Sequence, residues 1–516
     1  MTRSIRRTCT LLALAALAGP LPARAQRPLA AGFPPELDAY LERALREWQI
    51  PGMAIAVVRN DSVLVAKGYG VKELGRPGRV DEHTVFDAAS LTKSFTATAV
   101  AMLVDEGKMR WDDPVVQHLP DLVLPDPYLT RNATVRDFLS HRTGLHGSNM
   151  MWYPTSVDRP EVLRRMRFVR ASAPFRTGMV YSNIGYTVAG EAAARAAGTS
   201  WEDLVRRRII RPLGLTSTVA SYADTERMPN VASPHALIGG VQRPIRREVQ
   251  RSAIAPAGDV QSTVTDLATW MRFHLANGVL DGRRLVSDSS MQEMHSPQAI
   301  IATTPGMRAA RQVEFFAAYG LGWQVMDYRG HPMLWHSGNG DGQIAYMALL
   351  PKDRLGVVVL VNTWAAPFVH GALASYILDV YLGLEPRDHS AEALARVPAM
   401  REAQEAARRR LVEGLVPGSS PPLPLAAYAG TYVDSLFGPV SVRVEGRGLV
   451  MQMDRGQQAD LLHQEDDTFV VRWRDEILRE FFGTRVEFGA ASDCVRGLQM
   501  RLNRDSIAAT RSCGPG

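Results

Sequence analysis

A segment rich in proline and serine, residues 416–424, divides this chain into two parts with different patterns. Before it, from about residue 35 to 385, helical and strand-like patterns alternate. After it, short β-rich runs follow one another, separated by turn signals. This change predicts an α+β region followed by a small all-β domain, a barrel or a sandwich, over residues 425–516. Residues 386–424 form the connection, a charged helical stretch that ends in the Pro-rich segment.

The α+β region has strand-like runs at both of its ends. Residues 54–70 hold two β-rich runs around an Asn-Asp turn, which predicts a hairpin, and residues 344–351 and 355–362 predict a second hairpin. Residues 90–109, between them, form a long helical pattern with Gly107 near its end. Early strands, central helices and late strands indicate a chain that returns to its first sheet.

The first 25 residues have the three-part form of a secretory signal peptide. A basic start is followed by an apolar stretch of about eleven residues and by Ala23-Arg24-Ala25, which has the form of a cleavage site. The apolar stretch is too short to span a bilayer, and a buried N-terminal helix is the alternative interpretation. We therefore expect cleavage after Ala25 and a periplasmic or secreted protein without stable membrane insertion.

Charge and cysteine content narrow the choice of partners. The net charge is +6, but four arginines and no acid lie in residues 1–25, which leaves +2 for the rest of the chain. A nucleic-acid partner needs a clustered positive surface, so none is expected. Three cysteines are too few for a disulfide-dense scaffold or a CxxC zinc module. Cleavage would leave Cys494 and Cys513, either as a disulfide or as two free thiols.

Ser90 and Lys93 form the first candidate motif, at the start of the long helical pattern. Residues three apart share a helix face, so the hydroxyl and the ammonium meet about one turn apart. A serine becomes a nucleophile through a neighbouring base or cation, and a helix N-terminus adds backbone N–H groups beside it. Lysine occurs at only five positions of the chain, and here the surrounding helix face is apolar. The alternative is a capping serine with a solvated lysine.

Two later motifs carry polar groups that could face one cleft. Tyr181 and Asn183 are two residues apart in an extended or loop segment, so they point the same way. Residues 336–339 (His-Ser-Gly-Asn) follow a strand-like run, and such an edge can pair with a peptide-like substrate and offer N–H groups to an oxyanion. Each motif alone is better explained as an ordinary loop or turn. His141 and His146 lack partners at metal-ligand spacing, which predicts structural histidines and no metal.

Together the three motifs resemble the penicillin-recognising serine hydrolases, which include class C β-lactamases, D-alanyl-D-alanine carboxypeptidases, D-aminopeptidases and related esterases. Residues 86–93, 134–145 and 319–323 match further stretches of this family in its order. The resemblance covers about residues 35–385. It implies a class C β-lactamase-like fold over residues 32–385, an antiparallel sheet flanked by helices plus an all-helical region. No cofactor is expected.

The resemblance also implies a role for the first two motifs. Ser90 would be acylated, and Lys93 and Tyr181 would share the acid–base work. Asn183 would orient the amide of the substrate.

In the strand motif, His336, Ser337 and Gly338 would line the wall of the site opposite the nucleophile. The backbone N–H groups of Ser90 and Asn339 would form the oxyanion hole. His336 departs from the β-lactamase pattern, which has lysine there. With an ordinary pKa near 6.5, its imidazole would be mostly neutral at pH 7. The site would lack a permanent cation for a substrate carboxylate, which favours D-aminopeptidase, amidase or esterase chemistry on D-amino-acid peptides or small esters.

The sequence leaves other functions open. A true β-lactamase, a D-alanyl-D-alanine carboxypeptidase and a non-catalytic penicillin-binding sensor or scaffold are the alternatives. The C-terminal part resembles the lipocalin-like domain of some relatives, in which it shapes substrate access or assembly. A small molecule or a peptide is the expected partner, and a homo-oligomer is left open.

Overall fold

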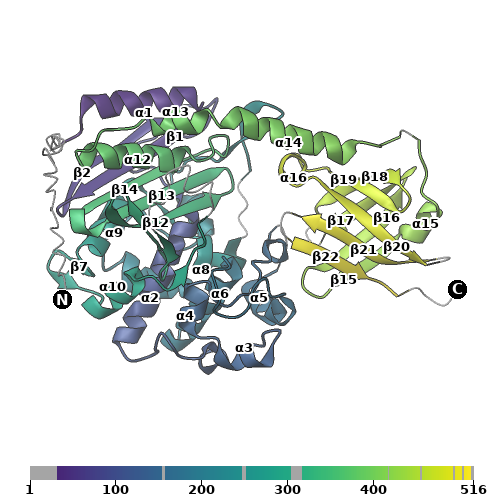
Figure 1. The fold of residues 1–516 in the computed structure, drawn as a ribbon, viewed down its shortest axis with the longest axis horizontal. Helices are drawn as coiled ribbons and strands as arrows, with labels where there is room; N and C mark the ends of the chain where they lie inside the picture. Colours follow the sequence, from purple (N-terminus) through teal and green to yellow (C-terminus); the bar gives the residue numbers. More distant parts are fainter. Residues whose placement is uncertain are drawn as a thin grey trace, which may run out of the picture.

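A computed structural model describes most of the chain: residues 32–153, 157–246, 251–303, 316–416, 418–453, 456–491, 494–502 and 505–512 (Figure 1). The predicted signal peptide, Cys513 and the side chain of Cys494 lie outside these described residues. Export and the disulfide therefore stay predictions.

The first part of the chain is built on one antiparallel sheet of eight strands. Their order is β2 (Ser62–Gly70), β1 (Gly52–Arg59), β14 (Leu355–Val361), β13 (Gln343–Leu350), β12 (His331–Gly340), β11 (Gln324–Tyr328), β10 (Ala317–Tyr319) and β9 (Ala299–Ile300). Both predicted hairpins are present, and the late strand β14 pairs with the early strand β1. The prediction of an α+β fold whose chain returns to its first sheet is confirmed.

Helices cover both faces of the sheet because both faces of its central strands are apolar. In β14, Val357 and Val359 pack with α1 (Pro35–Glu47) and α12 (Val369–Tyr381), on the upper side in Figure 1. The alternate residues Val358 and Leu360 pack on the other side with α9 (Val264–Leu275) and the helical region beyond it. Successive side chains point to opposite faces, so a strand buried on both faces appears as a continuous apolar run.

The helical region holds α2 (Thr92–Asp105), α4 (Val135–Leu139), α6 (Asn183–Ala197), α8 (Ala255–Gly258) and α10 (Asp288–His295). Three further helices belong to this region: α3 (Pro127–Asn132), α5 (Arg159–Arg165) and α7 (Trp201–Val205). The helix expected over residues 90–109 is shorter at both ends. It begins with a 3₁₀ turn, Ala89–Leu91, and stops before Gly107, which takes the left-handed conformation (φ +69°). A glycine adopts this conformation without strain, so it ends the helix.

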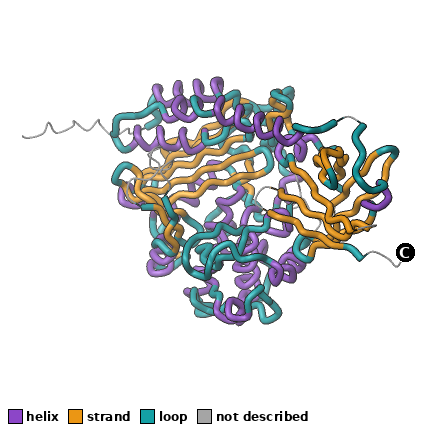
Figure 2. The backbone as a smooth tube through the Cα atoms, turned by 45° about the vertical axis from the view of Figure 1, so that its right-hand side comes forward, coloured by secondary structure: helices purple, strands orange, loops and turns teal. Residues whose placement is uncertain are grey.

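Two helices connect this part to a closed barrel. α13 (His389–Leu394) packs on α12, and α14 (Val397–Val412) is largely exposed and reaches the barrel (Figure 1). The eight barrel strands stand apart from the larger sheet in Figure 2. They are β15 (Gly430–Asp434), β16 (Gly438–Glu445), β17 (Gly448–Met453), β18 (Gln458–Glu465), β19 (Thr468–Trp473), β20 (Thr484–Ala491), β21 (Cys494–Leu502) and β22 (Asp505–Thr510). Of the two predicted all-β forms, the barrel is the one observed.

Aromatic rings from different parts of the barrel pack against one another. Phe488 contacts Tyr428, Tyr432 and Phe469, with ring centroids 5.2–5.7 Å apart. All four residues are buried. Aromatic pairs at this separation contribute about 0.5–1.5 kcal/mol each beyond their buried area, so this cluster stabilises the barrel. In the described part of the chain, no helix is long and apolar enough to cross a membrane.

Candidate active site

Ser90 lies in the turn that leads into α2. The short strand β3 (Phe86–Asp87) pairs with β6 (Gln261–Ser262), and the Asp87 carboxylate accepts a hydrogen bond of 2.8 Å from the backbone N–H of Ala89. Ala89 has φ +45°, an unusual conformation for a residue with a side chain. The tight turn leaves Ser90 only half-buried, directly before the first helical turn.

Lys93 is fully buried and touches the serine hydroxyl. Its Nζ lies 2.9 Å from Ser90 Oγ, 2.9 Å from Asn183 Oδ1 and 2.9 Å from the backbone oxygen of Ala257. All three partners are neutral, so none of them supplies a negative charge that would offset the cost of burying a charged amine. Burial therefore holds the pKa of Lys93 well below its ordinary value. A neutral amine beside a hydroxyl can accept its proton.

Tyr181 contacts the same serine from the other side. Its hydroxyl donates a hydrogen bond of 3.0 Å to Ser90 Oγ, and Lys93 Nζ lies 4.8 Å from the centre of its ring. Desolvation raises the pKa of the phenol, so the hydroxyl keeps its proton. We call Ser90, Lys93, Tyr181 and Asn183 the serine cluster. The structure brings these four predicted residues together.

Asn183 begins α6 with its amide held in one orientation. Its Oδ1 accepts from Lys93, and its Nδ2 donates to Asn149 Oδ1 over 3.3 Å. An amide nitrogen carries two hydrogens, so the second can donate to a substrate carbonyl. The contact with Asn149 is a feature that the sequence analysis missed.

The strand β12 passes directly beside the nucleophile. It pairs with β13 over residues 334–340 but with β11 only over residues 331–335, so its last five residues extend past β11. A Cβ atom added to Gly338 would lie 2.5 Å from the Ala88 oxygen and 3.2 Å from the Ser90 nitrogen. Glycine therefore allows this close approach, and Ser337, Gly338 and Asn339 lie on the strand beside the serine cluster.

We expect Gly338→Ala to lower kcat/KM at least tenfold, because the new methyl group must push β12 away from Ser90. Overpacking of this kind also costs about 1–3 kcal/mol of stability. Gly371→Ala in α12 is the control, since its Cβ would make only ordinary contact, 3.5 Å from the Tyr346 ring. Ester hydrolysis and thermal melting of both variants check the prediction. Full activity of Gly338→Ala would show that the approach of β12 is not needed.

The expectation of an ordinary pKa for His336 is wrong. The residue is 2% exposed, its Nε2 lies 2.9 Å from the Tyr319 hydroxyl, and its Nδ1 lies 2.7 Å from the backbone oxygen of Ser337. Burial, and then the nearby Lys93, lower the pKa of His336 to about 3. The imidazole is therefore neutral, and both of its nitrogens have hydrogen-bond partners. It supplies no positive charge to a substrate carboxylate, and its contact with the substrate stays a prediction.

A pH experiment tests this correction. A group with a pKa of about 3 stays neutral throughout a range of about pH 5.5 to 8.5. Nitrocefin, which carries a carboxylate, and p-nitrophenyl acetate should therefore give pH profiles of kcat/KM that His336→Gln leaves unchanged in shape. A step near pH 6.5 seen only for nitrocefin, and lost in His336→Gln, would show that the imidazole titrates normally.

His141 contributes more to the site than the sequence analysis predicted. Its ring centre lies 4.4 Å from that of Tyr181 and 4.6 Å from that of Tyr319, and its Nδ1 accepts a hydrogen bond from the Ser182 N–H. Burial holds the pKa of His141 well below its ordinary value. The neutral ring therefore supports the segment that carries Tyr181. The stretch 134–145, which matches the family pattern, contained a signal for this role.

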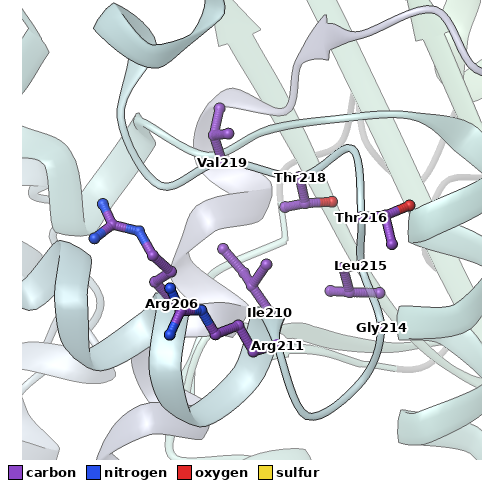
Figure 3. Close-up of a pocket in the computed structure, with 8 residues that line it drawn as sticks. All are labelled: Arg206, Ile210, Arg211, Gly214, Leu215, Thr216, Thr218 and Val219. Carbon is purple, nitrogen blue, oxygen red and sulfur yellow. The ribbon is translucent and has the colours of Figure 1, made fainter.

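A separate hollow lies away from these residues. It has a volume of about 360 Å³ and is lined by eight residues between positions 206 and 219 (Figure 3). One of them, Thr218, donates to the Asp266 carboxylate and so belongs to the framework of the fold. No member of the serine cluster lines the hollow, and it is therefore not the candidate active site. Among the described residues, no group of three His, Cys, Asp or Glu side chains could hold a metal ion.

A half-buried serine beside a buried lysine, a tyrosine and an asparagine, next to a strand of an antiparallel sheet, defines a class of serine hydrolases. Residues 37–382 match the family model described as Beta-lactamase. The chain belongs to this β-lactamase family of serine hydrolases. Residues 416–510 match a domain of unknown function, DUF3471.

Two named relatives resemble most of the chain. It is 31% identical over 440 residues to the unguisins hydrolase ungD of Aspergillus violaceofuscus, a match that covers 79% of this chain and 76% of the relative. It is 30% identical over 401 residues to penicillin-binding protein 4 of Amycolatopsis lactamdurans, covering 75% of this chain and 95% of that protein.

Solved structures confirm the predicted fold. The octameric penicillin-binding protein homologue from Pyrococcus abyssi superposes with a TM-score of 0.61 at 20% identity, covering 92% of this chain and 99% of that one. A class C β-lactamase superposes with a TM-score of 0.55 at 19% identity, covering 68% of this chain and 96% of that one. The family resemblance and the class C β-lactamase-like fold are both confirmed.

Proposed function

We propose that this protein is an exported hydrolase that forms an acyl-enzyme on Ser90. The observation that carries the proposal is the position of Lys93 Nζ, buried and within 2.9 Å of both Ser90 Oγ and Asn183 Oδ1. A lysine kept neutral by burial is a base, whereas a solvated lysine at pH 7 is not.

The reaction follows from these positions. Ser90 Oγ attacks the substrate carbonyl carbon, and its proton passes to the neutral amine of Lys93. The oxyanion that develops accepts hydrogen bonds from the backbone N–H groups of Ser90 and Asn339. The bond to the leaving group breaks, the leaving group takes a proton from Tyr181, and Lys93 returns a proton to Tyr181. A water molecule then attacks the acyl ester, Lys93 and Tyr181 again transfer the protons, and the acid is released as Ser90 regains its hydroxyl.

The proposed substrates are amides or esters, namely D-amino-acid peptides or small esters. A neutral His336 provides no cation for a substrate carboxylate, which supports neutral acyl groups over β-lactams and C-terminal carboxylates. The relative named for hydrolysing unguisins supports a hydrolytic function. A β-lactamase or a D-alanyl-D-alanine carboxypeptidase remains the alternative enzyme, since the relatives include a penicillin-binding protein.

A substrate panel separates these functions. Purified protein would be tested with p-nitrophenyl esters, nitrocefin, D-Ala-p-nitroanilide and L-Ala-p-nitroanilide. We expect turnover of esters and of the D-anilide above the L-anilide, with nitrocefin slower. Labelling by a fluorescent penicillin without turnover of any substrate would instead favour a penicillin-binding sensor.

Two further proposals concern location and assembly. The first is cleavage of the signal peptide after Ala25. Mass spectrometry of the protein from an exporting host should show an N-terminus at Gln26, whereas an intact Met1 would contradict cleavage. We propose that the barrel, which resembles a lipocalin-like domain, shapes substrate access or assembly, and one structural relative is named as octameric. Light scattering of the purified protein tests for a homo-oligomer.

A further inference from the structure

The C-terminal barrel reaches the loop beside the serine cluster. We call residues 146–153 the bridging loop. Asp505, the first residue of β22, accepts a hydrogen bond of 2.8 Å from the backbone N–H of Met150, and its other oxygen lies 3.2 Å from His146 Nδ1. The Asp505 residue is only 4% exposed, so this contact is shielded from water.

A second contact holds the far end of the same loop. The ring centre of Tyr153 lies 6.0 Å from that of Phe482, which follows the barrel helix α16 (Glu476–Phe481). The barrel therefore touches the bridging loop at both ends. An attached domain that served only as a spacer would need neither contact.

The bridging loop carries a residue that touches the serine cluster. Directly before Met150, Asn149 accepts the hydrogen bond from Asn183 Nδ2, and Asn183 in turn accepts from Lys93. Asn149 and Met150 are neighbours in one 3₁₀ turn, Asn149–Met151, which follows Ser148 in the left-handed conformation (φ +43°). A direct series of contacts thus runs from Asp505 through the turn to the Asn183 amide.

The buried Met150 N–H makes this series sensitive to Asp505. Without the carboxylate, a buried donor would lose its acceptor, and the turn would shift to reach water or another partner. Asn149 would move with the turn, and the Asn183 amide would lose the partner that sets its orientation. Titratable and charged groups that face Asp505 include His146, which packs from the hydrolase side.

We propose that Asp505 is a positioning residue, by which the barrel fixes the bridging loop and so orients Asn183 toward an amide on the acyl side of the substrate. This inference rests on the proposed hydrolase function. It predicts that the barrel influences which acyl groups are accepted, and that the chemistry at Ser90 itself depends on it less.

Two esters with the same leaving group test the inference: N-acetyl-D-alanine p-nitrophenyl ester, which has an acyl-side amide, and p-nitrophenyl acetate, which has none. We expect Asp505→Ala in the full chain to lower kcat/KM about tenfold for the first ester, the loss expected for one well-placed hydrogen bond, and threefold or less for the second. Asp505→Asn, whose amide oxygen can still accept from Met150, should restore the first value to within about threefold.

Arg165→Gln is the matched control. Arg165 donates to the backbone oxygen of Leu436 in the barrel and pairs with Glu161, and neither partner belongs to the bridging loop, so its removal should affect both esters equally. Equal losses for both esters in Asp505→Ala, or wild-type rates for both, would overturn the inference. Fluorophosphonate labelling of the wild type distinguishes failure of this inference from failure of the proposed function. If the reagent labelled no serine, the hydrolase function itself would be contradicted.

Discussion

Replacing Ser90 with alanine should abolish turnover of every substrate, with a loss of at least about 10⁴-fold in kcat, and should abolish covalent labelling. The hydroxyl lies between the Lys93 amine and the Tyr181 hydroxyl, at 2.9 and 3.0 Å. It is the hydroxyl that the proposed base and the proposed acid share. Ester hydrolysis and fluorophosphonate labelling are the measurements, and a melting curve should show that the fold is retained.

Ser94→Ala is the control for this variant. Ser94 lies one helical turn further along α2 and donates to the backbone oxygen of Leu91, while Trp270 donates to it. Its loss should cost about 1–2 kcal/mol of stability and leave labelling intact. If Ser90→Ala kept as much esterase activity as Ser94→Ala, the nucleophile would have to be another residue.

Replacing Lys93 with methionine should lower kcat by about 10³-fold or more, because methionine fills the same space without a proton acceptor. Lys93→Arg should be equally inactive, since a guanidinium stays protonated and cannot act as a base. Lys108→Met is the control, because Lys108 is exposed and pairs with Glu106. Retained activity in Lys93→Arg would show that the residue supplies charge and is not the base.

The wild-type pH profile tests the same assignment. Burial lowers the pKa of Lys93, so the neutral, reactive form appears at a lower pH than it would for a solvated lysine. The rate should therefore rise as the pH rises through this lowered pKa. A rate that falls over that range would require the protonated amine in the reaction.

The elements that the sequence predicts best are those whose signal is local. The hairpin of residues 54–70 and the apolar run at 355–362 appear as strands because their patterns directly encode burial. The spacing of Ser90 and Lys93 predicts their contact for the same reason, since residues three apart share a helix face. The roles of Tyr181 and Asn183 came from the family resemblance, because their meeting with Ser90 depends on tertiary structure.

What the sequence could not show depends on burial and on distant contacts. The pKa of His336 follows from the packing of Tyr319 and the strand around it, which no local pattern encodes. The contact between Met150 and Asp505 joins residues 355 positions apart. Its two ends lie in the hydrolase part and in the barrel, so no local pattern in the sequence links them.

The most direct test of the central claim is to map the covalent adduct. Tryptic digestion after fluorophosphonate labelling gives the peptide of residues 80–93, in which Ser90 is the single serine. The proposed function predicts that this peptide carries the label, and that a pre-steady-state burst of p-nitrophenol matches the labelled fraction. A label on any other peptide, or steady turnover by protein that no serine reagent modifies, would contradict an acyl-enzyme on Ser90.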